Sequence, residues 1–210
     1  MLHLKYYKEY GLALEGLTRH HKIDPLQFNR EVDDALPLDN ILEPDPKLRE
    51  LIKDIDRSKV KLWLLTNAYV NHAKRVVKLL QVDDLFDGVT YCDYGKMPLI
   101  CKPSQEMYKQ AEVDAGASGP DQCYFVGRLF SRLFFFIAPK CQEKLTRDMI
   151  DDSHLNCKHA EVRCWTTVHL IEPGLPIPRI PACKYTVHRL EDLRVHFPYL
   201  FKSTSEPTSK

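Results

Sequence analysis

The chain has 210 residues, which is long enough for one domain with a sizeable core of its own. Its 30 Lys and Arg residues are balanced by 29 Asp and Glu residues, so the net charge gives no reason to expect nucleic acid or an anionic membrane as a partner. The strongest apolar run, at 133–138, is far too short to cross a bilayer, which takes roughly 20 residues.

Helices are expected over the first 44 residues. Asp24-Pro25 is a typical helix start, with the aspartate as N-cap and the proline at the first helical position. Apolar residues between Tyr6 and Leu17 recur at helical spacing. Asp45-Pro46 is a second start, and the apolar residues at 48–55 predict an amphipathic helix behind it.

From residue 60 onward the pattern alternates between strand and helix. Apolar strands are expected at 60–65, 89–92, 122–126 and 166–171, and helices at 70–80 and 104–116. This alternation predicts an α/β fold with a parallel sheet and helices on both faces. Ligands of such sheets bind outside the carboxyl ends of the strands, so the residues at those ends are the first candidates for a site.

Thr66-Asn67 ends the first of these strands. A hydroxyl and an amide there can donate hydrogen bonds to a phosphoryl oxygen, and the N-terminus of the next helix adds its dipole. The alternative is an ordinary helix cap, because Thr and Asn are common at such turns.

Lys102 lies between an apolar stretch and Pro103, which fixes the turn into the next helix. A lysine held at this point can neutralise phosphate charge as a compact cation. Taken alone, it is equally typical of a solvated surface lysine.

Asp151-Asp152-Ser153 places two carboxylates side by side. Adjacent carboxylates repel each other unless a cation lies between them, and oxygen-rich pairs of this kind suit Mg²⁺ bridged to a substrate phosphate. The alternative is a helix N-cap pair that complements the helix dipole. The three motifs together predict a metal-assisted phosphate site.

The segment 127–150 interrupts the alternation with a basic and aromatic sequence. Joining Val126 directly to Asp151 would give a strand that delivers two carboxylates to the expected site. We therefore favour translated non-coding sequence or another gene-model error for this segment, on the grounds of local inconsistency. The alternative is a genuine surface loop or a partner-binding helix. The tail at 202–210 is polar and is expected to be disordered.

The motifs resemble, in order, the second, third and fourth motifs of the haloacid dehalogenase-like superfamily of phosphohydrolases. The sequence around them is similar to the fungal pyrimidine 5′-nucleotidase group, most clearly at Tyr6–Ala13, Leu62–Ala68 and Leu85–Tyr94. The resemblance covers roughly residues 6–126 and resumes over 151–172. It implies a Rossmann-like core over 45–201 and part of a helical cap over 1–44.

The resemblance also implies an activity, the Mg²⁺-dependent hydrolysis of nucleoside monophosphates. Thr66, Asn67 and Lys102 would then bind the phosphoryl group, and Asp151 and Asp152 would hold Mg²⁺. The expected ligand is a small phosphorylated metabolite, above all a pyrimidine nucleoside monophosphate. Seven cysteines without a Cys-x-x-Cys pair are typical of free thiols, and no apolar signal core begins the chain. We expect a cytoplasmic protein, with the nucleus as a second location.

One part of the family's site has no match, because the resemblance implies an Asp-x-Asp nucleophile on a first strand ahead of the cap. The chain has one such sequence, Asp54-Ile55-Asp56, which lies too late in the order and is interpreted as a solvated helix end. We therefore expect a core that lacks its first strand, no catalytic nucleophile and little or no activity, with the metal pair displaced by the segment 127–150. The alternative is a non-catalytic phosphate- or partner-binding protein that uses that segment.

Overall fold

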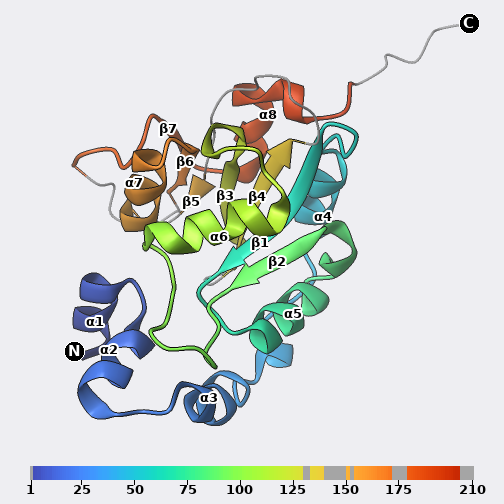
Figure 1. The fold of residues 1–210 in the computed structure, drawn as a ribbon. Coiled ribbons are helices and arrows are strands. Elements are labelled where there is room, and N and C mark those ends of the chain that lie inside the picture. The colour runs from blue at the N-terminus through green and yellow to red at the C-terminus, as the bar shows by residue number, and fades with distance from the viewer. Residues whose placement is uncertain (1, 130–132, 140–149, 152–153, 172–178, 204–210) are drawn as a thin grey trace, which may run out of the picture.

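The computed structural model of the chain describes residues 2–129, 133–139, 150–151, 154–171 and 179–203 (Figure 1). These residues form a seven-stranded sheet with helices on both faces, which confirms the predicted α/β class. Within these ranges, no helix combines the length and the apolar character that crossing a membrane requires. Of the tail at 202–210, predicted to be disordered, residues 204–210 lie outside the described ranges, whereas the Lys202 N–H donates to the Asp54 carbonyl oxygen at 2.8 Å.

The N-terminal region is helical, as predicted. It contains α1 (Leu2–Tyr10), α2 (Ala13–His21) and α3 (Pro25–Phe28), and α3 continues into one π-helical turn at Asn29–Asp33. The predicted cap is present, because the Asp24 carboxylate accepts a hydrogen bond from the Gln27 N–H at 2.6 Å. In Figure 1, α1 and α2 form a helical hairpin beside the loop that precedes α6.

The next elements are α4 (Pro46–Lys53), β1 (Val60–Thr66), α5 (Val70–Leu79), β2 (Gly88–Tyr91) and α6 (Gln105–Ala115). Their bounds lie close to the predicted ones, and α4 and α6 have local start or stop signals. Asp45 caps α4, Ser104 caps α6, and Gly116 ends α6 in the left-handed conformation at φ +70°.

The remaining elements are β3 (Tyr124–Leu129), β4 (Leu133–Pro139), β5 (Ile150–Asp151), α7 (His154–Val162), β6 (Thr166–Leu170), β7 (Tyr185–Val187) and α8 (Leu193–His196). The strand order is β2-β1-β4-β3-β6-β5, and β7 pairs with β6. Every pairing is parallel except those of β4, which runs antiparallel to β1 and to β3.

The described part of segment 127–150 lies in the sheet, and the prediction that this segment comes from a gene-model error stays a prediction. Residues up to Leu129 continue β3, and Leu133–Pro139 form a central strand between β1 and β3. A run of apolar residues fits this place, because a central strand covered on both faces needs no polar side. The described part of the segment is therefore neither a surface loop nor a helix.

The two faces of the sheet carry separate core clusters, and consecutive residues of β1 point to opposite faces. Leu64 packs with α4, α5 and the segment around α8, whereas Leu65 packs with α6, Trp165 and Phe125. Figure 1 shows α6 crossing one face of the sheet. A third cluster joins the N-terminal hairpin to the loop after β2 through Leu14, Tyr94 and neighbouring residues.

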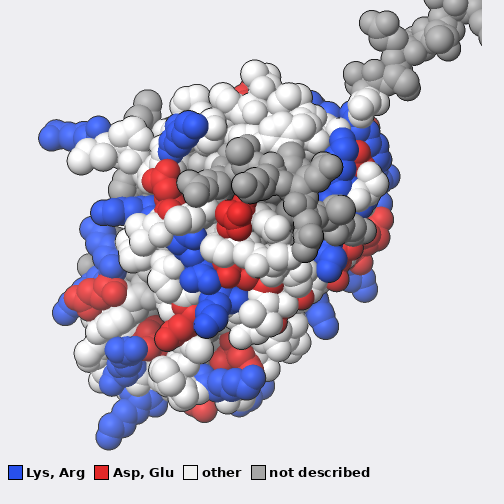
Figure 2. All heavy atoms as spheres, turned by 45° about the horizontal axis from the view of Figure 1, so that its top comes forward, with Lys and Arg blue, Asp and Glu red and all other residues white. Residues whose placement is uncertain are grey.

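Charges are distributed over the surface without a single-sign region on the face drawn in Figure 2, where Lys and Arg alternate with Asp and Glu. This agrees with the near-equal numbers of basic and acidic residues in the sequence. The visible face therefore has no basic stripe of the kind that tracks a nucleic acid backbone.

Candidate functional site

Thr66 is the last residue of β1 and its side chain is fully buried. Its hydroxyl oxygen accepts a hydrogen bond from the Ala68 N–H at 3.0 Å. Helix α5 begins later, at Val70, with Tyr69 as its N-cap residue. Thr66 is therefore not the helix cap that the alternative interpretation required, and it lies at the carboxyl edge of the sheet.

The side chain of Asn67 connects the Thr66-Asn67 motif to the Lys102-Pro103 motif. Its Oδ1 accepts a hydrogen bond from the Lys102 N–H at 2.7 Å, and its Nδ2 donates to the Lys102 carbonyl oxygen at 2.9 Å. Nδ2 also lies 3.3 Å from the carbonyl oxygen of Gly11, which it contacts as a donor. Two segments that are 35 residues apart in the chain are thus held against each other by one side chain.

Lys102 is fully buried, which contradicts the alternative of a solvated surface lysine. Its ammonium donates to the Leu65 carbonyl oxygen at 3.2 Å and lies 4.9 Å from the centroid of the Phe125 ring. Lysine is almost never fully buried without a specific role, because its charge loses hydration. The ammonium therefore lies inside the fold, between the end of β1 and Phe125 of β3.

The turn between α1 and α2 packs against the same place. Gly11 has φ +76°, and a Cβ at this position would lie 2.1 Å from Pro103 Cδ and 2.4 Å from the Lys102 carbonyl oxygen. The Cys101 thiol donates to the Tyr10 carbonyl oxygen at 3.7 Å. Only glycine permits such a close approach of two backbones, so the helical hairpin touches the Lys102 segment directly.

A buried pair of thiols lies beside this contact. Cys92 and Cys101 belong to one apolar cluster and both are buried. The pKa of the Cys92 thiol is raised, first by its hydrogen bond with Cys101 and then by burial. A thiol held in this protonated form is a poor nucleophile, so the pair packs the core rather than supplying the reactive group of the site.

Asp151 is placed by the register of the sheet. Leu64 and Val126 both pair with Phe135, and Val126 and Ile150 both pair with Val168. Asp151 therefore lies at the level of Leu65, but on β5, which is separated from β3 by β6. The displacement predicted for the metal pair stays a prediction, since Asp152 lies outside the described residues and Asp151 stands two strands away from β3 at the same level of the sheet.

The metal-binding prediction lies mostly outside the described residues. Asp152 and Ser153 are not described, and Asp151 is placed as a residue of β5 only. Among the described residues, no cluster of three His, Cys, Asp or Glu side chains is arranged to hold a metal ion. Two carboxylates adjacent in sequence are donors of the kind that suits Mg²⁺, which binds through one or two carboxylates and keeps several waters.

The Asp-x-Asp sequence precedes the amino end of β1, opposite to the end that carries Thr66. Asp54 is the C-cap of α4 and pairs with Arg194, and Asp56 pairs with Lys59 at 3.0 Å. Both precede β1, whereas Thr66 ends it, so about 20 Å of strand separates them from the site. The arrangement agrees with the interpretation of this sequence as a solvated helix end.

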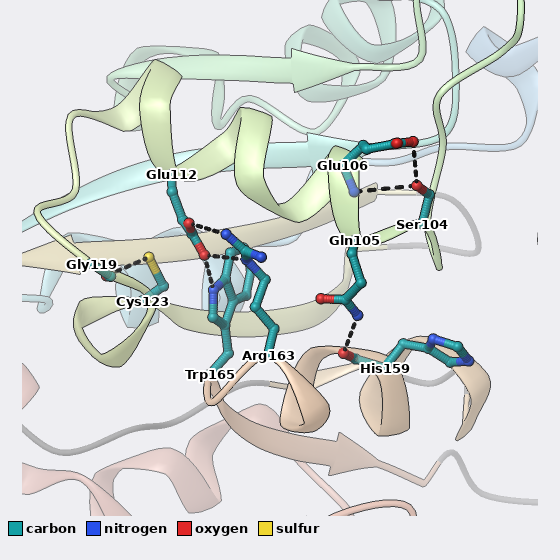
Figure 3. Close-up of polar contacts among 9 residues, drawn as sticks. All are labelled: Ser104, Gln105, Glu106, Glu112, Gly119, Cys123, His159, Arg163 and Trp165. Atoms are coloured by element: carbon teal, nitrogen blue, oxygen red, sulfur yellow. Dashed lines mark hydrogen bonds and ion pairs between the residues drawn. The ribbon is translucent and has the colours of Figure 1, made fainter.

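Sequence reasoning missed the network that fastens α6 to the region after α7 (Figure 3). The Glu112 carboxylate accepts two hydrogen bonds from Arg163 and one from Trp165 Nε1, each at 2.6 Å. The hydrogen bonds raise the pKa of the Arg163 guanidinium. Gln105 adds a second link, because its Nε2 donates to the His159 carbonyl oxygen at 2.8 Å. The available signal was an acidic residue on the apolar face of α6, next to Ala111.

A pocket of about 470 Å³ opens elsewhere, between β2, the loop at 93–100 and α6. Its lining includes Thr90, Lys96 and Asp114 but none of the three phosphate-binding candidates. Since the pocket lies beyond the edge strand β2, it gives no support to the site at the end of β1.

Comparison with known proteins agrees with this geometry. A family model described as "haloacid dehalogenase-like hydrolase" matches residues 4–127. The protein named "Phosphate metabolism protein 8" from Saccharomyces cerevisiae is 45% identical over 129 residues, which are 58% of this chain and 40% of that protein. The chain thus matches less than half the length of that relative. With the family match covering more than half of its residues, the chain belongs to the haloacid dehalogenase-like hydrolase family.

Proposed function

We propose that this chain carries the phosphate- and metal-binding part of a Mg²⁺-dependent phosphatase site, with pyrimidine nucleoside monophosphates as its substrates. One observation carries the proposal: the side chain of Asn67 joins the Lys102 segment to the end of β1, beside Thr66. Two motifs of a hydrolase family thus meet at the edge of the sheet where α/β proteins bind ligands.

The described residues suit phosphoryl binding. The Thr66 hydroxyl can donate to a phosphoryl oxygen, and the Lys102 ammonium supplies a positive charge. Because Lys102 is excluded from water, its attraction to an anion is stronger than that of a surface lysine. Asp151 and Asp152 would hold the Mg²⁺ ion, which neutralises negative charge on the phosphoryl oxygens when bound.

Turnover by these 210 residues alone is proposed to be slow. Their single Asp-x-Asp sequence ends at Asp56, at the opposite end of β1 from Thr66. An aspartate there cannot reach a phosphoryl group bound near Lys102. Loss of the nucleophile that forms a covalent intermediate removes nearly all catalysis, although binding residues remain.

Binding is therefore the first test. With Mg²⁺ present, calorimetry should detect inorganic phosphate binding to the chain, and Lys102→Met should weaken it at least about tenfold. Lys109→Met is the matched control, because this lysine is exposed on α6 and should leave the affinity unchanged. Equal affinities for the wild type and the Lys102 variant would refute the assignment of the site.

Hydrolysis is the second test. Phosphate release from UMP or CMP with Mg²⁺ should not exceed that of an Asp152→Asn variant. Release well above that variant would show that the 210 residues contain a working nucleophile, and the proposal of slow turnover would be wrong.

The alternative of a non-catalytic partner-binding protein receives less support from the fold. It requires segment 127–150 as the interface, yet Leu133–Pro139 are paired on both sides, with β1 and with β3. A strand in this position has no edge left for a partner strand.

A further inference from the structure

We propose that the side chain of Asn67 is a positioning group that holds the Lys102 segment in place and does not itself bind the phosphoryl group. This inference deepens the proposed function, because it rests on Lys102 as the phosphate-binding cation. It reassigns one of the three residues that the family resemblance grouped together.

The first argument is the use of the amide's hydrogen-bonding capacity. A primary amide has two N–H donors, and the Asn67 Nδ2 contacts two carbonyl oxygens, those of Lys102 at 2.9 Å and Gly11 at 3.3 Å. Both donors are therefore directed at the protein backbone. Phosphoryl oxygens are acceptors, so they would have to displace one of these carbonyls to receive a hydrogen bond from this side chain.

The second argument is the geometry of the contact with Lys102. Asn67 Oδ1 accepts from the Lys102 N–H at 2.7 Å while Nδ2 donates to the carbonyl of the same residue. A two-point contact of this kind fixes both the position and the direction of a backbone segment, as a strand partner does. The side chain of Lys102 then leaves a backbone that has little freedom to turn.

The third argument is that hydrogen bonds from other segments hold the backbone of Asn67 in place. The Tyr94 hydroxyl donates to the Asn67 carbonyl oxygen at 3.1 Å, and the Cys92 N–H donates to the preceding carbonyl, that of Thr66, at 3.1 Å. The contact between the Asn67 side chain and the Lys102 backbone forms a clamp. This clamp is therefore anchored to β1 and to the loop after β2. A side chain must be held in this way if it is to position another residue.

Gly11 extends the clamp to the helical hairpin of α1 and α2. Its carbonyl is the third group bound by Asn67, and its missing Cβ allows the approach to Lys102 and Pro103. The hairpin, the end of β1 and the Lys102 loop thus meet at one side chain. This arrangement couples the N-terminal helices to the charge that binds phosphate.

A double-mutant cycle separates positioning from direct contact. Asn67→Ala should weaken binding of inorganic phosphate in the presence of Mg²⁺ about tenfold, by releasing the Lys102 segment. In a Lys102→Met background the same change should have almost no further effect, because its influence acts through Lys102. An equal loss in both backgrounds would mean that Asn67 contacts phosphate independently, and would overturn the proposal.

A second measurement does not depend on phosphate. Cys101 is buried next to the clamp, so its alkylation rate reports whether the Lys102 segment is held. Asn67→Ala and Asn67→Asp should both raise this rate at least about fivefold, because each loses the two donated hydrogen bonds. The rate at Cys157, which is buried in a different cluster, should stay at the wild-type value and thereby exclude general unfolding.

The outcomes of the two experiments are distinguishable. An unchanged Cys101 rate in a folded variant would overturn the positioning role, whatever the phosphate result. A wild-type chain that fails to bind phosphate would refute the proposed function, and the alkylation rates would still decide whether Asn67 holds the segment. If Asn67→Ala fails to fold, Asn67→Asp carries the alkylation measurement alone and decides the positioning role, because it keeps the acceptor for the Lys102 N–H but adds a negative charge that would itself repel phosphate.

Discussion

The two sides of the sheet are assembled in different ways. On the side of β1 and β2, neighbouring strands are parallel and are linked through α5, and the site residues follow the end of β1. On the side of β3 and β6, the antiparallel strand β4 lies between β3 and β1. Strand β6 pairs in parallel with β3 on one side and with β5 on the other. Local crossovers through α5 and α7 link β1 to β2 and β5 to β6, whereas the pairings of β1 with β4 and of β3 with β6 join distant segments.

The difference explains how an irregular segment coexists with a regular site. β4 fills the space between β1 and β3 while β5 returns the chain to the register that β3 leaves at Val126. Val126 of β3 and Ile150 of β5 therefore lie at the same height along the strand direction, although the insertion separates them in sequence.

Deleting residues 127–150 should have the largest effect, because it removes the strand that connects the two sides. Joining Val126 to Asp151 leaves the inner edges of β1 and β3 without β4. We expect a loss of more than about 5 kcal/mol, enough to abolish cooperative urea unfolding of a typical domain. The variant that lacks residues 204–210 controls for shortening the chain. Cooperative unfolding at the wild-type midpoint would show that β4 is dispensable and would favour the interpretation of 127–150 as foreign sequence.

Glu112→Ala should destabilise the fold by about 3–4 kcal/mol, because it leaves the Arg163 charge and the Trp165 N–H without their partner. This network ties α6, on the β1 side, to the residues before β6 (Figure 3). Glu106→Ala is the matched control on the same helix: it is exposed, bonds only locally with Ser104, and should cost less than about 1 kcal/mol. Similar shifts of the urea midpoint for both variants would argue against a special role for Glu112.

Gly11→Ala should cost about 2–3 kcal/mol, because the added Cβ meets Pro103 and the Lys102 backbone. Gly116→Ala separates strain from collision. Its φ of +70° is similar, but the nearest atom to its Cβ is Lys61 Nζ at 3.6 Å, so only about 1 kcal/mol of backbone strain is expected. Thermal unfolding of both variants gives the comparison, and equal losses would mean that the close approach at Gly11 relaxes without cost.

Asp56→Asn should have the smallest effect, which is present above about pH 3.8, disappears in acid, and arises before β1, at the end remote from Thr66. Hydrogen bonds from Ser58 and Lys59 lower the pKa of Asp56 from 3.8 to about 2. A folded pKa below the unfolded one means that this stabilisation is fully present above pH 3.8 and is lost as the pH falls through about 2. The urea midpoints of the wild type and the variant should therefore differ at pH 5 and converge near pH 2. A difference that stays constant over this range would contradict the assignment.

Much of the site's location was predictable from the sequence, because strand ends and helix starts carry local signals. The apolar run before Thr66, the proline after Lys102 and the caps at Asp24, Asp45 and Ser104 all act within a few residues. These signals gave the elements from α1 to α6 and the edge at which Thr66 lies. Whether Lys102 is buried or solvated could not be read from them, since burial depends on what packs over the side chain.

Only the tertiary structure decided the contacts between distant segments. The sequence alone determined an α/β chain with three motifs typical of a phosphate site, because hydrophobic period and turn chemistry are local. It did not determine that β4 enters the sheet, that Asp151 returns to the level of Leu65, or that Asn67 binds Gly11 and Lys102. Strand pairing and side-chain contacts across 35 or more residues depend on which partner buries the most surface and satisfies the backbone, and that choice is made by the whole fold.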